Sequence, residues 1–329
     1  MKVIADNQLK LIEINRSMIY WIPLLLFWLI WILLLGNQSI VLVFQDYWQS
    51  SITMIAGSFV AGATPLGGGA VAFPVFTKLM QVSSSDASFF SLLIQSVGMT
   101  FASLFFISRN TMINWKVIRY ACIGSFVSLP LSLIFISLEN ITARFIFSEF
   151  IVFCAFIILW KKQNPYLEKM KSLYWAVLFG FLGGLLTAKI GSGCDAILYF
   201  YLVFICQHCA KDSIPTTVCF MAINSVYASI WLLLTSTPNE FVVGSWWASA
   251  PIVSIGAPLG AYVLSKLKTS QTVIMIITII SIEVISSLLL APFSLMNKLT
   301  IVPHHYDIIN VYSLAKKIPI NMPYFNTLI

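Results

Sequence analysis

The stretch Ala61-Gly-Ala-Thr-Pro-Leu-Gly-Gly-Gly-Ala-Val-Ala-Phe-Pro74 lies in the middle of an apolar block, residues 51–80. A second glycine-rich stretch, Thr187-Ala-Lys-Ile-Gly-Ser-Gly-Cys-Asp195, lies in the middle of another, residues 173–205. Each block has about 30 residues, whereas one helical crossing of a bilayer needs about 20. Glycine and proline weaken helices. Each block therefore predicts two helical pieces joined by a break.

The whole chain is too apolar for a water-soluble protein. Of its 329 residues, 59% are hydrophobic and 9% are charged, and the mean hydropathy is +0.91. Soluble domains carry about 25% charged residues, so a lone soluble domain, a disordered chain and a secreted disulfide scaffold are excluded. The net charge of +7 comes from scattered single basic residues. We expect a lipid bilayer as the surroundings and no nucleic-acid partner.

Nine apolar blocks predict an all-α, polytopic membrane helix bundle. The blocks are too long for barrel strands and lack the alternating pattern of a membrane barrel. Lys2, Lys10 and Arg16 precede the first block, which is longer than a signal-peptide core, so we expect it to be a retained leading helix. The blocks cover residues 18–36, 51–80, 87–107, 116–137, 143–160, 173–205, 213–235, 246–265 and 272–293.

The two halves of the chain follow the same pattern. Gly67–Gly69 and Gly191–Gly193 are 124 residues apart, and Trp115 has a counterpart 131 residues later in Trp246. These offsets differ only by small loop insertions. The pattern predicts four parts: an N-terminal segment with the leading helix (1–50), a first repeat (51–160), a second repeat (173–293) and a polar C-terminal tail (294–329).

The placement of basic residues predicts how the glycine-broken blocks meet the membrane. If all nine blocks cross from a cytoplasmic N-terminus, 8 loop and terminal Lys and Arg fall inside and 10 outside, against the positive-inside rule. If the two broken blocks are re-entrant hairpins, the totals become 13 inside and 5 outside. Each repeat then has three crossings, so the second is inverted relative to the first. Inverted repeats with broken helices are typical of secondary transporters.

A break inside a membrane segment leaves backbone N–H groups without intrahelical partners. Such groups at the start of a half-helix suit an anion. Two breaks that face each other would form an anion cradle without a cluster of arginines. Close helix packing by small residues is the alternative role for the glycines.

The sequence resembles the sulfite exporter TauE/SafE family over residues 51–293. The resemblance rests on Ala61–Pro74, on Ser88 to Ser91, on Asn114-Trp115 and on the small residues around Gly124. It implies a membrane permease, not an enzyme, that moves sulfite, sulfonates or related small anions without a cofactor. By position, it implies that one half of the substrate site is formed by Thr64, Pro65, Gly67, Gly68, Gly69 and Pro74, and the other by Gly191, Ser192 and Gly193.

The second motif departs from the family pattern by carrying Lys189 and Asp195. A charge inside a membrane is rarely left facing lipid. Lys189 would contact the anion directly, and Asp195 would neutralise Lys189 or carry a coupled proton. The structural alternatives are a Lys189–Asp195 pair that fixes the loop, or a lysine whose side chain reaches the headgroups.

Polar residues on the following helices complete the predicted site. Gln95 in the first repeat and Asn224 in the second offer side-chain donors to oxyanion atoms, with interhelical hydrogen bonding as the alternative. Glu283 stands alone in an apolar block and is a second candidate proton carrier, whereas Glu149 is expected near a helix end.

These patterns predict an anion permease of a bacterial inner membrane, working by alternating access between the repeats. The leading helix lies outside the repeats, where it is available for a homodimer interface. Two rival hypotheses remain: a membrane redox protein that uses Cys206, His208 and Cys209, and a non-transporting assembly factor. No spaced metal-ligand set or nucleotide motif is present.

Overall fold

The computed structural model describes residues 2–136, 139–140, 142–143, 145–150, 173–278 and 280–281, without the side chains of residues 2–15 and 37–39. In this part of the chain the structure is a helix bundle without strands, as predicted. Five of the described helices are long and apolar enough to cross a membrane: residues 16–35 of α1, and α5, α6, α10 and α11.

The elements follow in this order: α1 (Lys2–Leu35), α2 (Asn37–Asp46), α3 (Trp48–Ala63), α4 (Gly69–Pro74), the π-helical turn η1 (Val75–Leu79), α5 (Ser84–Ser108), α6 (Trp115–Phe135), α8 (Tyr174–Ile190), α9 (Cys194–Phe200), the π-helical turn η2 (Tyr201–Ile205), α10 (Ala210–Thr235) and α11 (Glu240–Lys266). Residues 140–150 are helical where described, and so are residues 269–278.

Both glycine-broken blocks are interrupted helices, as the sequence predicts. The first block forms α3, a break at residues 64–68, and then α4 with η1; we call residues 48–79 hairpin 1. The second forms α8, a break at residues 191–193, and then α9 with η2; we call residues 174–205 hairpin 2. The blocks 87–107, 116–137 and 213–235 agree with α5, α6 and α10 to within a few residues, whereas α1 and α11 begin 16 and six residues earlier than predicted. The later parts of the blocks 143–160 and 272–293 lie outside the described residues. The sequence analysis missed α2, a ten-residue helix without a side-chain N-cap.

Each hairpin enters and leaves at the same end of the bundle. The ring of Phe241 contacts both Tyr47, just before α3, at 6.4 Å and Phe76, in η1, at 5.6 Å. Likewise, Phe179 near the start of α8 lies 5.5 Å from Tyr201 in η2. Both blocks therefore have the re-entrant geometry that the charge pattern favoured.

The two hairpins end in the same local structure. Met80 N–H donates to Val75 O and Val82 N–H to Phe76 O, and 126 residues later Cys206 N–H donates to Tyr201 O and His208 N–H to Leu202 O. Gln81 and Gln207 both have left-handed backbone, with φ of 57° and 59°. The Cys206–Cys209 segment is thus the counterpart of residues 80–83, which contain no cysteine.

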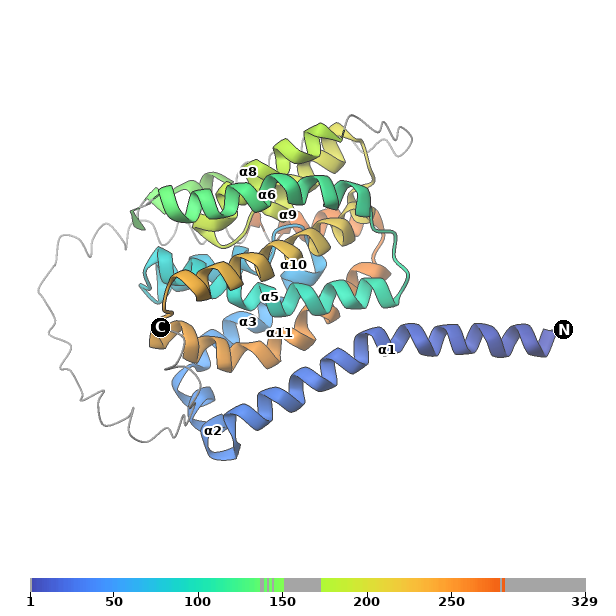
Figure 1. Ribbon diagram of the computed structural model, residues 1–329, viewed down its shortest axis with the longest axis horizontal. Coiled ribbons are helices and arrows are strands. Elements are labelled where there is room, and N and C mark those ends of the chain that lie inside the picture. The colour runs from blue at the N-terminus through green and yellow to red at the C-terminus, as the bar shows by residue number, and fades with distance from the viewer. Residues whose placement is uncertain are drawn as a thin grey trace, which may run out of the picture.

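The helices are stacked in three pairs, with α1 alongside (Figure 1). In that view α6 and α8 lie above, α5 and α10 in the middle, and α3 and α11 below. The N-terminal part of α1 extends past the bundle, whereas its membrane-length part packs through Tyr20 and Leu24 against Phe101 of α5. The middle pair is therefore enclosed by the outer two pairs.

The outer pairs are held by reciprocal small-residue contacts. Gly62 of α3 approaches the backbone of Ala257 of α11, and Gly180 of α8 approaches the backbone of Ala121 of α6 so closely that neither glycine has room for a Cβ atom. Such contacts let helix backbones come together without a bulky interface. The first helix of each hairpin thus packs on the last long helix described for the other half.

Candidate functional site

The two breaks meet in the centre of the bundle, next to α5. Ser91 of α5 donates from Oγ to Gly191 O at 2.9 Å. A Cβ atom placed on Gly69 would lie 2.7 Å from Ser91 Oγ and 2.8 Å from Ser192 Cβ. Residues 61–70 and 190–196 are all buried. The breaks therefore form one closed site, to which hairpin 1, hairpin 2 and α5 contribute.

The break of hairpin 1 is shaped by a threonine and a glycine. Thr64 Oγ1 donates to Val60 O at 2.9 Å and accepts the N–H of Leu66 at 3.3 Å, so it terminates α3. Gly67 then takes a left-handed φ of +70°, which other residues rarely adopt. Pro65, between them, has no N–H to satisfy. Thr64 and Pro65 are thus placed at the predicted site, but the Thr64 hydroxyl caps the helix.

After this turn, two consecutive backbone N–H groups form no hydrogen bond within the described part of the chain. Ala70 N–H donates to Gly67 O, and Val71 N–H and Ala72 N–H donate to Gly68 O. Among the described residues, no acceptor is found for the N–H groups of Gly68 and Gly69. Pro74 is buried farther along, at the junction of α4 and η1. Hairpin 1 therefore offers free donors at a buried break.

The break of hairpin 2 is closed by its own side chains. Thr187 Oγ1 accepts the N–H of Cys194 at 2.7 Å. Asp195 Oδ1 accepts the N–H groups of Gly193 at 3.3 Å and Ala196 at 3.0 Å. Thr187 and Asp195 thus bind three N–H donors of this break, whereas no acceptor is found among the described residues for the N–H of Ser192. Ser192 Oγ and Asp195 Oδ2 are both buried, and neither has a partner in the described part of the chain.

Gln95 lies between the breaks but has no donor left for an anion. Its Nε2 donates to Ser91 Oγ at 2.8 Å and to Gly191 O. A side-chain amide has two N–H donors, and both are therefore used. Its free atom is the acceptor Oε1. This geometry does not fit the donor role that the sequence analysis gave to Gln95.

The structure does not form the Lys189–Asp195 pair. Lys189 is half-buried in the last turn of α8, a position that favours a cation. Asp195 Oδ1 accepts backbone N–H groups, and its Oδ2 has no partner in the described part of the chain. The alternative in which this pair fixes the loop is therefore wrong.

The remaining predicted site residues are less informative. Asn224 is buried on α10, where Nδ2 donates to Phe220 O at 2.7 Å and Oδ1 has no partner. Glu149 is exposed, and Glu283 lies outside the described residues. The sequence analysis did not assign Ser91 or Thr187 to the site. Two signals were available: Ser91 is one helical turn before Gln95, and Thr187 occupies nearly the same repeat position as Thr64.

A separate cavity of about 370 Å³ lies between α5, α10 and α11. Its lining is apolar except for two serines, so it offers no charge to an anion. The residues around it are Leu93, Ser96, Val226, Ser229, Ile230, Leu233, Pro238, Val243 and Trp246. Its lining differs from the breaks, where backbone N–H groups and a serine hydroxyl without partners among the described residues lie together.

Membrane-length helices around two buried, facing helix breaks define a class of protein, the membrane permeases built on broken helices. The model of one family, sulfite exporter TauE/SafE, matches residues 51–287. The chain belongs to the TauE/SafE family of sulfite exporters, whose members are membrane transporters of sulfur-containing anions. A search of curated proteins found no match, and a search of solved structures found none either.

Proposed function

We propose that this protein is a secondary permease for small anions, with sulfite, sulfonates or other organosulfur anions as the substrate class. The observation that carries the proposal is the set of unpartnered donors at the break: the N–H groups of Gly68 and Gly69 and the Ser192 hydroxyl. An unpaired buried polar group is costly, so three of them together favour a bound acceptor such as an oxyanion. Lys189 adds a positive charge on the same hairpin as Ser192.

The proposed mechanism is alternating access between two inverted repeats. The element order of residues 48–135 recurs in residues 174–266, and the pairs α3–α11 and α6–α8 both run parallel. Ser50 faces Ser245 near the start of both helices of the first pair, and Gly62 faces Ala257 farther along. Parallel pairing of the first helix of one half with the last long helix described for the other half fits inversion. The site is buried, so substrate entry requires a movement of the hairpins.

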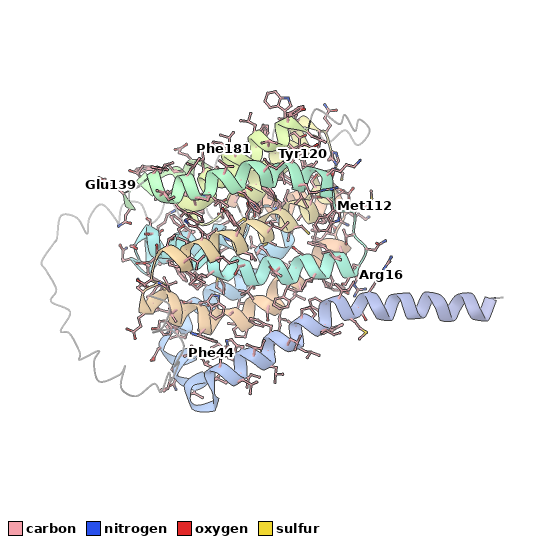
Figure 2. The ribbon with its side chains drawn as sticks, viewed as in Figure 1. Arg16, Phe44, Met112, Tyr120, Glu139 and Phe181 are labelled. Carbon is pink, nitrogen blue, oxygen red and sulfur yellow. The ribbon has the colours of Figure 1, made fainter. Side chains whose placement is uncertain are left out.

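The proposed orientation puts the N-terminus in the cytoplasm of a bacterium, with the protein in the inner membrane. Arg16 and the loop at Met112 lie at one end of the bundle, and Phe44 and Glu139 toward the other (Figure 2). Lys211 belongs to the first end, where its Nζ donates to Ser265 O at 3.2 Å. The end richer in basic residues would face the cytoplasm. A homodimer through α1 stays a prediction.

The test is anion flux in proteoliposomes, with sulfite, thiosulfate, sulfonates and carboxylates compared. Ser192→Ala should raise the anion concentration needed for half-maximal flux about tenfold, because a hydrogen bond to a charged group contributes about 1.5–3 kcal/mol. Ser229→Ala is the matched control: Ser229 is also buried and unpartnered, but it lines the apolar cavity. Absence of flux with every anion would favour the non-transporting assembly factor.

The redox hypothesis is disfavoured by the structure of the Cys206–Cys209 segment. The repeat counterpart of this segment adopts the same turn without cysteines. The Cys209 sulfur lies 3.6 Å from Thr269 Oγ1, and Cys206 is buried. Replacing Cys206 and Cys209 by serine should leave anion flux largely intact.

A further inference from the structure

Two side-chain oxygens that have no hydrogen-bond partner in the described part of the chain lie beside Gly67. A Cβ atom placed on Gly67 would lie 2.7 Å from Gln95 Oε1 and 2.8 Å from Asp195 Oδ2. Both side chains are buried, with exposed fractions of 2% and 0%, and neither oxygen has a partner in the described part of the chain. Without a donor, both buried oxygens would lack a hydrogen bond. If Asp195 were ionised, its negative charge would also be buried without a partner.

The orientation of the Gln95 amide is fixed by its other contacts. Its Nε2 donates to Gly191 O and Ser91 Oγ. Turning the amide over would place Oε1 against the carbonyl oxygen of Gly191, and these two acceptors would repel each other. Gln95 therefore presents an acceptor on the side of Gly67, where Asp195 Oδ2 also lies, and a proton on the carboxyl group would supply the donor that neither oxygen finds among the described residues.

Among the described residues, no charged side chain forms an ion pair with Asp195. The elements around it carry few titratable groups, and neither oxygen of Asp195 forms an ion pair with any of them in the described residues. The titratable groups nearest to Asp195 in the sequence are the Cys194 thiol and the Lys189 amine. The others are Lys78 in η1, Asp86 and Arg109 near the two ends of α5, Tyr199 and Tyr201 in α9 and η2, and Lys211, Asp212 and Cys219 on α10.

We propose that Asp195 and Gln95 form a proton-binding site, in which protonated Oδ2 of Asp195 donates to Oε1 of Gln95, and that this proton crosses the membrane with the anion. One proton satisfies both unpartnered oxygens, whereas a hard metal cation prefers several oxygen ligands. The inference rests on the proposed transport function, and it reassigns Gln95 from the anion to the proton.

The two sites are adjacent, which explains how proton and anion are coupled. Donors without acceptors lie at Gly68, Gly69 and Ser192, and acceptors without donors lie at Gly67. The protonated pair links α5 to hairpin 2. When the O–H bond breaks and the proton passes to water, the carboxylate faces an amide oxygen, and the two groups repel each other. The contact between α5 and hairpin 2 closes the anion site. Loss of the proton therefore loosens this contact and favours opening of the site.

The experiment measures anion accumulation in proteoliposomes with and without an imposed pH gradient, for an anion that the wild-type protein carries. At one proton per monovalent anion, a gradient of one pH unit supports about tenfold accumulation. In Asp195→Asn, the ratio between accumulation with and without the gradient should fall to about one. Asp212→Asn, which changes an exposed carboxylate on α10, should keep the wild-type ratio.

A second measurement does not depend on the activity of the variant. Infrared difference spectra of the wild-type protein minus Asp195→Asn should show the carbonyl band of a protonated carboxyl group near neutral pH. Absence of that band overturns the proposal, as does a wild-type flux that responds to a sodium gradient and not to pH. Wild-type protein without flux for any anion contradicts the transport function instead, so the two failures are distinguishable.

Discussion

At the residue scale, the site is defined by polar atoms that lack partners. Thr64 and Thr187 use their hydroxyls to shape the breaks. Asp195 binds the N–H groups at the start of α9, whereas the N–H groups of Gly68 and Gly69 stay free. The two halves of the site therefore differ in charge: hairpin 1 offers donors, and hairpin 2 carries the ionisable groups.

Lys189 provides a test at this scale. Lys189→Ala should raise the anion concentration for half-maximal binding by about tenfold or more, because it removes a positive charge from a partly buried position on hairpin 2. Binding of a labelled anion to the detergent-solubilised protein measures this effect. Lys266→Ala, at the end of α11 over the ring of Tyr262, is the control. If Lys189→Ala and Lys266→Ala bind the anion with equal affinity, Lys189 does not contact the anion and only stabilises the end of α8.

At the scale of elements, glycines determine how closely the outer helices pack. Gly62 and Gly260 let α3 and α11 approach, and Gly124 and Gly180 do the same for α6 and α8. These contacts hold the first arm of each hairpin against a helix long enough to cross a membrane. Close packing is therefore the role of these four glycines, whereas Gly67 and Gly191 have left-handed backbone in the breaks.

Gly180→Ala tests this packing. The added Cβ atom would collide with the backbone of Ala121, and separating two packed backbones costs about 1–3 kcal/mol. We expect a lower melting temperature in detergent and less monodisperse protein in size-exclusion chromatography. Leu182→Ala, on the exposed side of the same helix, should change neither. A melting temperature of Gly180→Ala equal to that of the wild-type protein would show that α6 and α8 tolerate a wider separation.

At the scale of the whole molecule, the ends of the bundle differ in charge. Asp46, Asp86 and Glu240 begin or end helices at the end where hairpin 1 opens, together with Lys78. Arg109, Lys116, Lys211 and Lys266 gather at the end where hairpin 2 opens. Because each hairpin returns to the end at which it enters, hairpin 1 opens at the first of these ends and hairpin 2 at the second.

Cysteine labelling tests this topology in intact cells. In a variant without its six native cysteines, Gln45→Cys and Ser85→Cys should react with a membrane-impermeant reagent, since both residues are exposed at the end that we assign to the outside. The native Met112 side chain is 84% exposed at the opposite end. Met112→Cys should therefore react only after the membrane is permeabilised. Labelling of positions 45 and 85 from opposite faces would contradict the hairpin geometry.

Much of the fold could be predicted because membrane helices are specified locally. Each helix satisfies its own backbone hydrogen bonds, so runs of apolar residues located α5, α6 and α10 to within a few residues. The short α2 was missed because ten residues are too few to stand out from the surrounding apolar sequence. Gln95 lies beside the breaks, but the direction of its amide depends on Gly191, which comes from hairpin 2, as well as on Ser91 of the same helix.

The sequence by itself determined that this protein is a membrane helix bundle with two broken helices, since composition, block length and glycine positions are properties of the chain alone. Only the tertiary structure decided which polar atoms remain free. A hydrogen bond from α5 to hairpin 2 orients the Gln95 amide, and Asp195 binds the N–H groups of its own hairpin. Donors compete for acceptors in three dimensions, and no spacing along the chain records which of them find a partner.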